Sequence, residues 1–176
     1  MFVKLESRGP AFFRQKRAGR NQKPFQLLKF RSMVISQNPE QEEFELGDSS
    51  RITRLGSLLR RNKLDELPEL FNVLNGDMSI VGPRPEVEKY VQFYPDDFKE
   101  ILAVRPGLSD FASIKYRNEE EILAKQDNPE KYYIKEILPD KLKLARKYLE
   151  EISLKTDLRI IGKTIKSLFL SRDQRQ

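Results

Sequence analysis

Two adjacent carboxylates, Asp65 and Glu66, are the side chains in this sequence with the clearest potential for chemistry. A carboxylate can attack phosphorus to form an acyl phosphate, and an acidic pair can hold Mg²⁺ on a diphosphate. Arginine grips phosphate oxygens bidentately, and Arg84 stands between two prolines that fix the local backbone. Three more cations directly precede the pair: Arg60, Arg61 and Lys63. The pattern favours phosphate chemistry, because nearby cations keep a carboxylate ionised and neutralise charge on a transferred phosphoryl group.

The alternative is a purely structural role for the acidic pair. Asp is a preferred N-cap, contributing about 1 kcal/mol, and Glu in a first turn suits the helix dipole. An apolar stripe with helical spacing follows the pair: Leu67, Leu70, Phe71 and Leu74. It predicts a helix that Asp65 caps and Gly76 ends. For an isolated Asp-Glu pair before a helix, this structural interpretation is the more common one.

The composition of the 176-residue chain narrows the chemistry, because it contains no histidine and no cysteine. These absences exclude a Ser-His-Asp triad, a thiol nucleophile, a disulfide and a thiolate zinc site. Any bound metal must rely on oxygen ligands, which suits a hard cation such as Mg²⁺. Asp65 and Glu66 are the candidate ligands.

The net charge of +6 is concentrated at the start of the chain. Residues 1–37 hold nine Lys/Arg and one acidic residue, a net charge of +8, whereas the remainder holds 24 basic and 26 acidic residues. Such a segment favours anionic partners such as phosphates, nucleic acid or an anionic membrane surface. A solvated basic face without a partner is equally consistent with the charge. No apolar run approaches the ~18 residues that span a bilayer.

The hydrophobic pattern predicts one α+β domain over residues 1–176, mostly helical, with a small N-terminal β-hairpin and peripheral amphipathic helices. The hairpin is predicted from strands at 11–15 and 25–31, joined by a turn at 19–24. A mobile polar loop is predicted at 36–50 and a disordered tail at the C-terminus, over 171–176.

Three further helices are predicted from apolar spacing and capping residues. They are a helix ending at Arg61 with a cap at Ser49, Ser50 or Thr53, a helix over 140–152, and a last helix capped by Thr156 or Asp157. The last helix is amphipathic and carries basic residues. It could lie on a membrane surface, but packing on a core is the more common fate of such a pattern.

A series of motifs along the chain resembles the bacterial sugar transferases, which are monotopic polyprenyl-phosphate phosphoglycosyl transferases. The series opens with the Gly-Pro turn and basic segment at 9–20. The stretch Leu64-Asp65-Glu66-Leu67-Pro68 resembles the active-site segment of that family. The other matching stretches are Lys29-Phe30-Arg31-Ser32-Met33, Val81-Gly82-Pro83-Arg84-Pro85 and Arg105-Pro106-Gly107-Leu108. The resemblance covers nearly the whole chain, and the order of its motifs makes it specific.

The resemblance implies a reaction in which sugar-1-phosphate passes from a UDP-sugar to polyprenyl phosphate, UMP leaves and Mg²⁺ is required. The nucleophile that forms a covalent phosphosugar intermediate would be Asp65. Glu66 would assist through metal binding or proton handling. The candidate phosphate- and substrate-binding residues are Arg60, Arg61, Arg84, Lys29 and Arg31.

The resemblance also implies a setting at the cytoplasmic face of the bacterial inner membrane. The expected partners are a UDP-sugar, polyprenyl phosphate, the membrane surface and a second copy of the chain, without nucleic acid. Family members carry a hydrophobic membrane-embedded segment before the Gly-Pro turn. Residues 2–8 resemble only the exit from that segment, so we expect either that the chain is truncated or that the protein docks without this anchor. The stretch 109–118 differs from that of many relatives, so we expect a different choice of sugar.

Two alternatives to this enzyme remain open at the level of sequence. One is a non-catalytic basic module that binds phosphate or nucleic acid through residues 1–37, with an affinity that falls steeply with salt. The other is an inactive, membrane-associated relative of the family.

Overall fold

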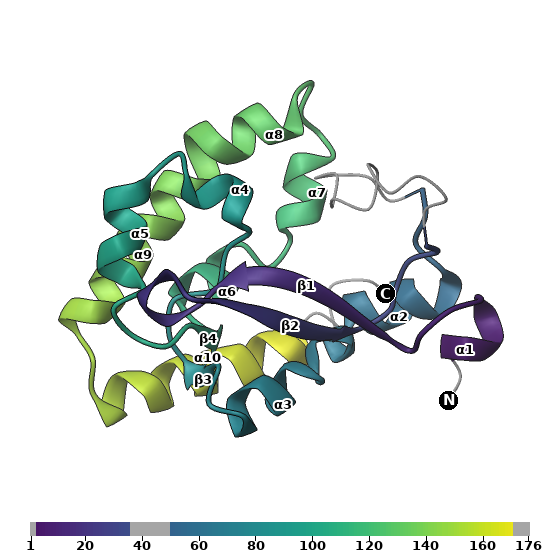
Figure 1. Ribbon diagram of the computed structural model, residues 1–176, viewed down its shortest axis with the longest axis horizontal. Helices are drawn as coiled ribbons and strands as arrows, with labels where there is room; N and C mark the ends of the chain where they lie inside the picture. Colours follow the sequence, from purple (N-terminus) through teal and green to yellow (C-terminus); the bar gives the residue numbers. More distant parts are fainter. Residues whose placement is uncertain (1–2, 36–49, 171–176) are drawn as a thin grey trace.

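The computed structural model describes residues 3–35 and 50–170. The loop predicted at 36–50, apart from Ser50, and the tail predicted at 171–176 lie outside this part of the chain. A β-hairpin crosses the middle of the molecule, with several short helices gathered toward one end of it (Figure 1). The predicted α+β class with mostly helical content is confirmed.

The hairpin consists of β1 (Phe12–Ala18) and β2 (Pro24–Phe30), which pair antiparallel. Phe12 lies opposite Phe30, and their rings stack with centroids 5.5 Å apart. The connecting turn contains the short helix η1 (Arg20–Gln22). The hairpin predicted from the sequence is confirmed, and Lys29 lies near the end of its second strand.

Helix α2 (Arg54–Arg61) begins at a residue predicted as its cap, because Thr53 Oγ1 accepts a hydrogen bond of 2.9 Å from the Gly56 N–H. The short helix α1 (Val3–Glu6) supplies a second cap. Both carboxylate oxygens of Glu6 accept from the Leu55 N–H, at 3.0 and 3.1 Å. Two separate side chains therefore satisfy the first N–H groups of the helix that leads to the acidic pair.

The acidic pair does not cap the next helix, so that prediction was wrong. Asp65 lies within the tight turn η3 (Leu64–Glu66), and the following helix α3 (Glu69–Leu74) begins after Pro68, without a side-chain cap. Lys63, in the left-handed conformation with φ 56°, turns the chain sharply before η3. This turn carries Asp65 away from the axis of α3 and into the protein, where it is buried.

Helix α3 is oriented opposite to a usual amphipathic helix. Its polar residues Glu69 and Asn72 are buried, whereas its apolar stripe of Leu67, Leu70, Phe71 and Leu74 is exposed. Asn72 explains the orientation in part, because its amide accepts from the Leu28 N–H at 3.0 Å and donates to the Gln26 carbonyl at 2.8 Å. These bonds join α3 to the free edge of β2. Gly76 follows the helix with φ +82°, as predicted for its end.

A short parallel pair of strands, β3 (Ser79–Val81) and β4 (Gly107–Ser109), was not predicted from the sequence. The two backbones meet closely at two glycines, Gly82 just after β3 and Gly107 at the start of β4. A Cβ atom on Gly107 would lie 2.1 Å from the Gly82 nitrogen. This strand pair holds the loop that contains Arg84 beside the segment 107–109.

The main apolar core gathers side chains from the helices after β3. These helices are α4 (Glu88–Val91), α5 (Pro95–Ile101), α7 (Glu119–Leu123), α8 (Pro129–Tyr132), the wider turn η4 (Tyr133–Ile137) and α9 (Leu138–Glu150). Helix α6 (Phe111–Lys115) packs instead on a second, smaller core. Phe98, Leu102, Leu123 and Leu138 are each at most 2% exposed within the main core. The helix predicted over 140–152 is confirmed as α9.

The last helix, α10 (Leu154–Leu170), packs on a second small core through Ile160, which is fully buried beside Val81 and Tyr148. The preferred prediction for this helix is therefore confirmed. Its predicted cap was wrong, because the Thr156 N–H donates to Ser153 Oγ, three residues earlier than the predicted start. Within the described residues, none of the helices is both long enough and apolar enough to span a membrane.

Gly56 provides a test of this packing. A Cβ atom there would lie 1.9 Å from the Ser32 carbonyl oxygen, so Gly56→Ala should lower the free energy of unfolding by about 2 kcal/mol or more. Gly162 is the matched control, because nothing lies within 4 Å of a Cβ placed at that position in α10. Gly162→Ala should raise stability by about 0.5–1 kcal/mol. Urea denaturation measures both, and equal effects would contradict the close approach of α2 to Ser32.

Candidate active site

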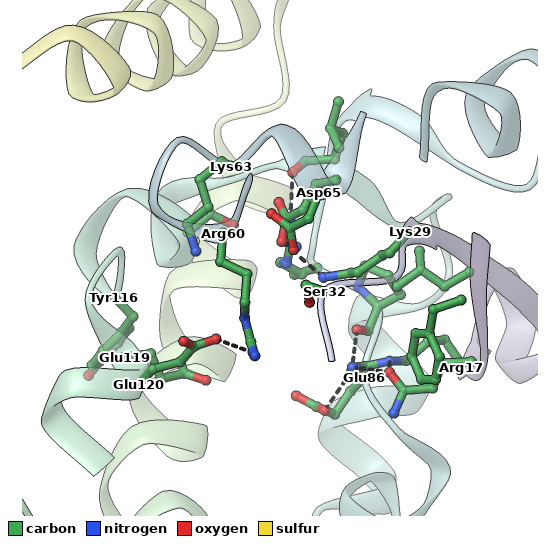
Figure 2. Close-up of a pocket in the computed structure, with 18 of the residues that line it drawn as sticks. Arg17, Lys29, Ser32, Arg60, Lys63, Asp65, Glu86, Tyr116, Glu119 and Glu120 are labelled. Carbon is green, nitrogen blue, oxygen red and sulfur yellow. Dashed lines mark hydrogen bonds and ion pairs between the residues drawn. The ribbon is translucent and has the colours of Figure 1, made fainter. Parts of the chain in front are cut away.

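A cavity of about 1940 Å³ lies between the hairpin and the helices of the second half of the chain. Both residues of the acidic pair line it, together with the predicted basic residues Lys29, Arg31, Arg60, Arg61 and Arg84. Figure 2 shows Asp65 and Lys29 close together, and Arg60 reaching across from another element toward Glu120. The structure thus brings residues far apart in sequence to one cavity.

Asp65 is 6% exposed, and its Oδ1 atom is buried without a hydrogen-bond partner. Burial raises the pKa of Asp65, while the positive charges of Lys29, Lys63 and Arg60 act in the opposite direction. An unpaired carboxylate oxygen at a cavity wall is poorly solvated, which favours reaction with, or binding to, an electrophile or cation.

Glu66 differs from its neighbour, because two cations hold it. Lys29 Nζ lies 3.0 Å from its Oε1 atom, and Arg84 Nη2 is hydrogen-bonded to the same oxygen. Burial alone would raise the pKa of Glu66, but the Arg84 and Lys29 charges outweigh it and hold this pKa well below its usual range. Glu66 therefore remains ionised at neutral pH, which favours an electrostatic or metal-binding role over proton handling.

Arg84 is fixed at both ends. Its Nη1 donates to the Leu108 carbonyl at 2.8 Å, its Nη2 pairs with Glu66, and its backbone N–H donates to Asp110 at 3.4 Å. Burial alone would lower the pKa of Arg84, but the Glu66 and Glu69 carboxylates raise it. A guanidinium held in this way loses little conformational freedom when it binds an anion.

Glu69 is a site residue that the sequence analysis did not single out. It is fully buried, lies 3.5 Å from Lys29 Nζ and 3.7 Å from Arg84 Nη2, and neither of its carboxylate oxygens has a hydrogen bond. Burial raises its pKa. No signal in the sequence pointed to it, because Glu69 lies on the helix face opposite the apolar stripe, and the polar face of an amphipathic helix usually points to solvent.

Arg60 reaches the cavity from the last turn of α2. Its Nη2 atom lies 2.5 Å from Glu120 Oε1 in α7, and its Nη1 atom is buried without a partner. Figure 2 shows this contact across the cavity. Its neighbour Arg61 is exposed and also lines the cavity. Glu120 is the second site residue that the sequence analysis missed.

Arg31 uses its donors on backbone carbonyls. Its Nη1 donates to Arg8 at 3.0 Å, and its Nη2 donates to Ser7 at 2.6 Å and to Val3 at 3.2 Å. These bonds hold the segment after α1 against the hairpin, although the side chain also borders the cavity. A role for Arg31 in substrate binding stays a prediction, with its two terminal nitrogens already bonded to the protein.

The match to a known protein family extends over nearly the whole chain. Residues 1–171 match the family model described as bacterial sugar transferase. The chain belongs to this family. It shares 38% identity over 171 residues with the UDP-glucose:undecaprenyl-phosphate glucose-1-phosphate transferase of Caulobacter vibrioides, which covers 94% of this chain and 59% of the relative.

Two other relatives of this bacterial sugar transferase are named for sugar-phosphate transfer and for exopolysaccharide production. The UDP-N-acetylgalactosamine-undecaprenyl-phosphate N-acetylgalactosaminephosphotransferase of Aeromonas hydrophila is 34% identical over 96% of this chain and 37% of its own length. The exopolysaccharide production protein ExoY of Sinorhizobium fredii is 35% identical over 97% of this chain and 75% of its own length. This chain thus spans 59% or less of the first two relatives.

The residues of the sugar transferase fit a magnesium ion only with help from a substrate. Among residues 3–35 and 50–170, no three acidic side chains are grouped so that they could hold a metal by themselves. Asp65 Oδ1 is unpartnered and suits one ligand position, and Glu66 is the second candidate. Mg²⁺ is usually held by one or two carboxylates together with substrate phosphates and water, so these two carboxylates would hold the ion only together with a substrate.

Asp65→Asn should make the protein more stable at neutral pH. Because burial raises the pKa of Asp65 in the folded protein, its ionisation opposes folding above that pKa, and this penalty disappears as the pH falls below the unfolded value of 3.8. The gain in the free energy of unfolding should be largest at pH 7 and shrink toward pH 4. Urea denaturation at both pH values measures it.

Asp127→Asn is the control, because Asp127 is exposed and does not line this cavity. An Asp65→Asn protein that is less stable than the wild type at pH 7 would contradict the assigned burial of the charge.

Proposed function

We propose that this bacterial sugar transferase transfers sugar-1-phosphate from a UDP-sugar to polyprenyl phosphate, releases UMP, and performs the first membrane step of glycan synthesis. The observation that carries the proposal is the buried Asp65 carboxylate, which has an unpartnered oxygen and lines a cavity together with Arg60, Lys29 and Arg84. A nucleophile surrounded by cations is what phosphoryl transfer requires. The named activities of the relatives support the same chemistry.

In the first step, an Asp65 oxygen attacks the phosphorus that carries the sugar. A new bond forms between this oxygen and phosphorus, while the bond from phosphorus to the UMP oxygen breaks and its electrons leave with UMP. The cations Arg60 and Arg84 are placed to stabilise the negative charge that develops on the phosphoryl oxygens. The product is an aspartyl phosphosugar.

In the second step, a phosphate oxygen of polyprenyl phosphate attacks the same phosphorus. The bond between phosphorus and Asp65 breaks, which restores the carboxylate and forms a polyprenyl diphosphate-linked sugar. Mg²⁺ held by the diphosphate together with Asp65 or Glu66 would neutralise charge and orient the phosphates. Glu66 remains ionised throughout and keeps Lys29 and Arg84 in position.

The basic segment at 1–37 is better explained by internal contacts than by nucleic acid. Arg17 pairs with Glu86 at 3.1 Å and Lys29 with Glu66 at 3.0 Å, while Arg31 binds backbone carbonyls. Lys16 also pairs with Glu88 at 3.0 Å on the surface. Several cations of this segment are therefore committed to the protein itself, which leaves fewer for a phosphate backbone.

The exposed apolar stripe of α3 supports a membrane-contact surface on the enzyme. Phe71 is 55% and Leu74 81% exposed, and they are joined by Leu67 and Leu70, which also line the cavity. A surface that continues from exposed leucines into the cavity would let a lipid phosphate reach Asp65 from the membrane. We place this surface on the cytoplasmic face of the inner membrane, where UDP-sugars are available.

Asp65→Asn should lower UMP release by at least about 10³-fold, because the amide cannot serve as the nucleophile. The assay contains the protein in detergent, Mg²⁺, polyprenyl phosphate and a panel of UDP-sugars. Asp127→Asn, the same change at an exposed position, should release UMP at the wild-type rate. UMP release by Asp65→Asn at the wild-type rate excludes the assigned nucleophile. Absence of turnover by the wild type with every UDP-sugar favours the inactive-relative alternative.

The double variant Phe71→Ser, Leu74→Ser should bind vesicles of phosphatidylethanolamine and phosphatidylglycerol about tenfold or more less tightly than the wild type. Both side chains lose apolar area that would enter the lipid, about 1 kcal/mol or more each. Phe93→Ser is the control, because Phe93 is also exposed but follows α4, on the other side of the hairpin in Figure 1. Flotation measures the bound fraction, and equal losses in both proteins would rule out α3 as the docking surface.

A further inference from the structure

The contact between Arg60 and Glu120 joins two walls of the cavity. Arg60 comes from the end of α2 and Glu120 from the first turn of α7, sixty residues later in the chain. The two side chains meet at 2.5 Å between Nη2 and Oε1. Figure 2 shows them approaching from separate elements, with the Arg60 guanidinium reaching past Asp65 to Glu120. This contact decides where the Arg60 side chain points.

Stability does not explain the contact. The Glu120 side chain is 52% exposed, and an ion pair with one such partner contributes about 0–1 kcal/mol to folding. The Arg60 side chain is only 15% exposed, and its Nη1 atom is buried without an acceptor. A buried charged donor without a partner is costly to folding, and it suits a site where an anion binds.

Helix α7 is a firm support for Glu120. The preceding residue, Glu119, pairs with Lys141 of α9 at 2.6 Å, and Lys141 Nζ also donates to the Tyr133 hydroxyl at 3.3 Å. Leu123 at the end of α7 is 1% exposed in the main core. The first turn of α7 is therefore tied to the most deeply packed part of the protein, so Glu120 can restrain an otherwise flexible arginine.

We propose that Glu120 is a positioning residue for the diphosphate of the nucleotide sugar. By holding Nη2, it fixes the direction of the Arg60 side chain at the cavity wall, so that the guanidinium, whose buried Nη1 has no acceptor, is already oriented when the anion arrives. Orienting a long side chain before binding removes an entropic cost that would otherwise weaken affinity. This inference rests on the proposed function, in which Arg60 binds substrate phosphate.

The test is calorimetric titration of the full chain with UDP and Mg²⁺, which measures phosphate binding without requiring turnover. Glu120→Ala should weaken UDP binding roughly 3–10-fold, because Arg60 is no longer oriented. Glu120→Gln should retain more affinity, because its amide oxygen can still accept from Nη2. The melting temperature of both variants should stay near that of the wild type, since the pair contributes little to folding.

A double-mutant cycle separates positioning from a direct or long-range effect. In an Arg60→Ala background, Glu120→Ala should cause no further loss of UDP affinity, because there is no guanidinium left to orient. Glu151→Ala is the charge-matched control, since it removes one negative charge at the exposed end of α9, where its partner Lys147 is 3.9 Å away. This control should bind UDP as the wild type does.

Three results would overturn the inference: wild-type UDP affinity in Glu120→Ala, an equal loss from Glu120→Ala with and without Arg60, or no UDP binding by the wild-type protein. Failure of the proposed function has a different signature. If the proposed function is wrong, UDP binding still follows the expected pattern, but no UDP-sugar yields UMP in the presence of polyprenyl phosphate.

Discussion

The site depends on a cluster of four charged side chains, Lys29, Glu66, Glu69 and Arg84, in which two cations lie between two carboxylates. They come from β2, η3, α3 and the loop between β3 and α4. A single buried charge is costly, and removing one partner from a buried pair leaves the other uncompensated. The cluster therefore joins these four elements and fixes the turn that carries Asp65 against the hairpin.

The cluster also explains the unusual orientation of α3. Because Glu69 must reach Lys29 and Arg84, the polar side of this helix faces inward. Asn72, one turn later, adds two hydrogen bonds to the edge of β2. The leucines of the helix are then left on the outside. The buried charge of Glu69 and the exposed apolar surface are thus two consequences of one helix orientation.

The sequence predicted the features that depend on neighbouring residues. Its predictions failed where contacts between distant residues determine the structure. Thr53 as a cap, the hairpin and Gly76 as a helix end all follow from local preferences, and each is present. Asp65 had the local preference of a cap. The contacts of its neighbour Glu66 with Lys29 and Arg84 instead hold it in the turn η3, before α3 begins. The three-residue strands β3 and β4 depend on the approach of Gly82 to Gly107.

The candidate site was predicted in the same uneven way. Asp65, Glu66, Lys29, Arg60 and Arg84 do meet in one cavity, and the motifs around them were the reason to expect it. Glu69 and Glu120 were missed, because no pattern shows that a helix is turned inward or that a glutamate sixty residues away will face an arginine.

The bonds of Arg31 to backbone carbonyls have a separate consequence. Every residue type offers a carbonyl, so positions 7 and 8 can change their side chains during evolution while the path of their backbone stays held.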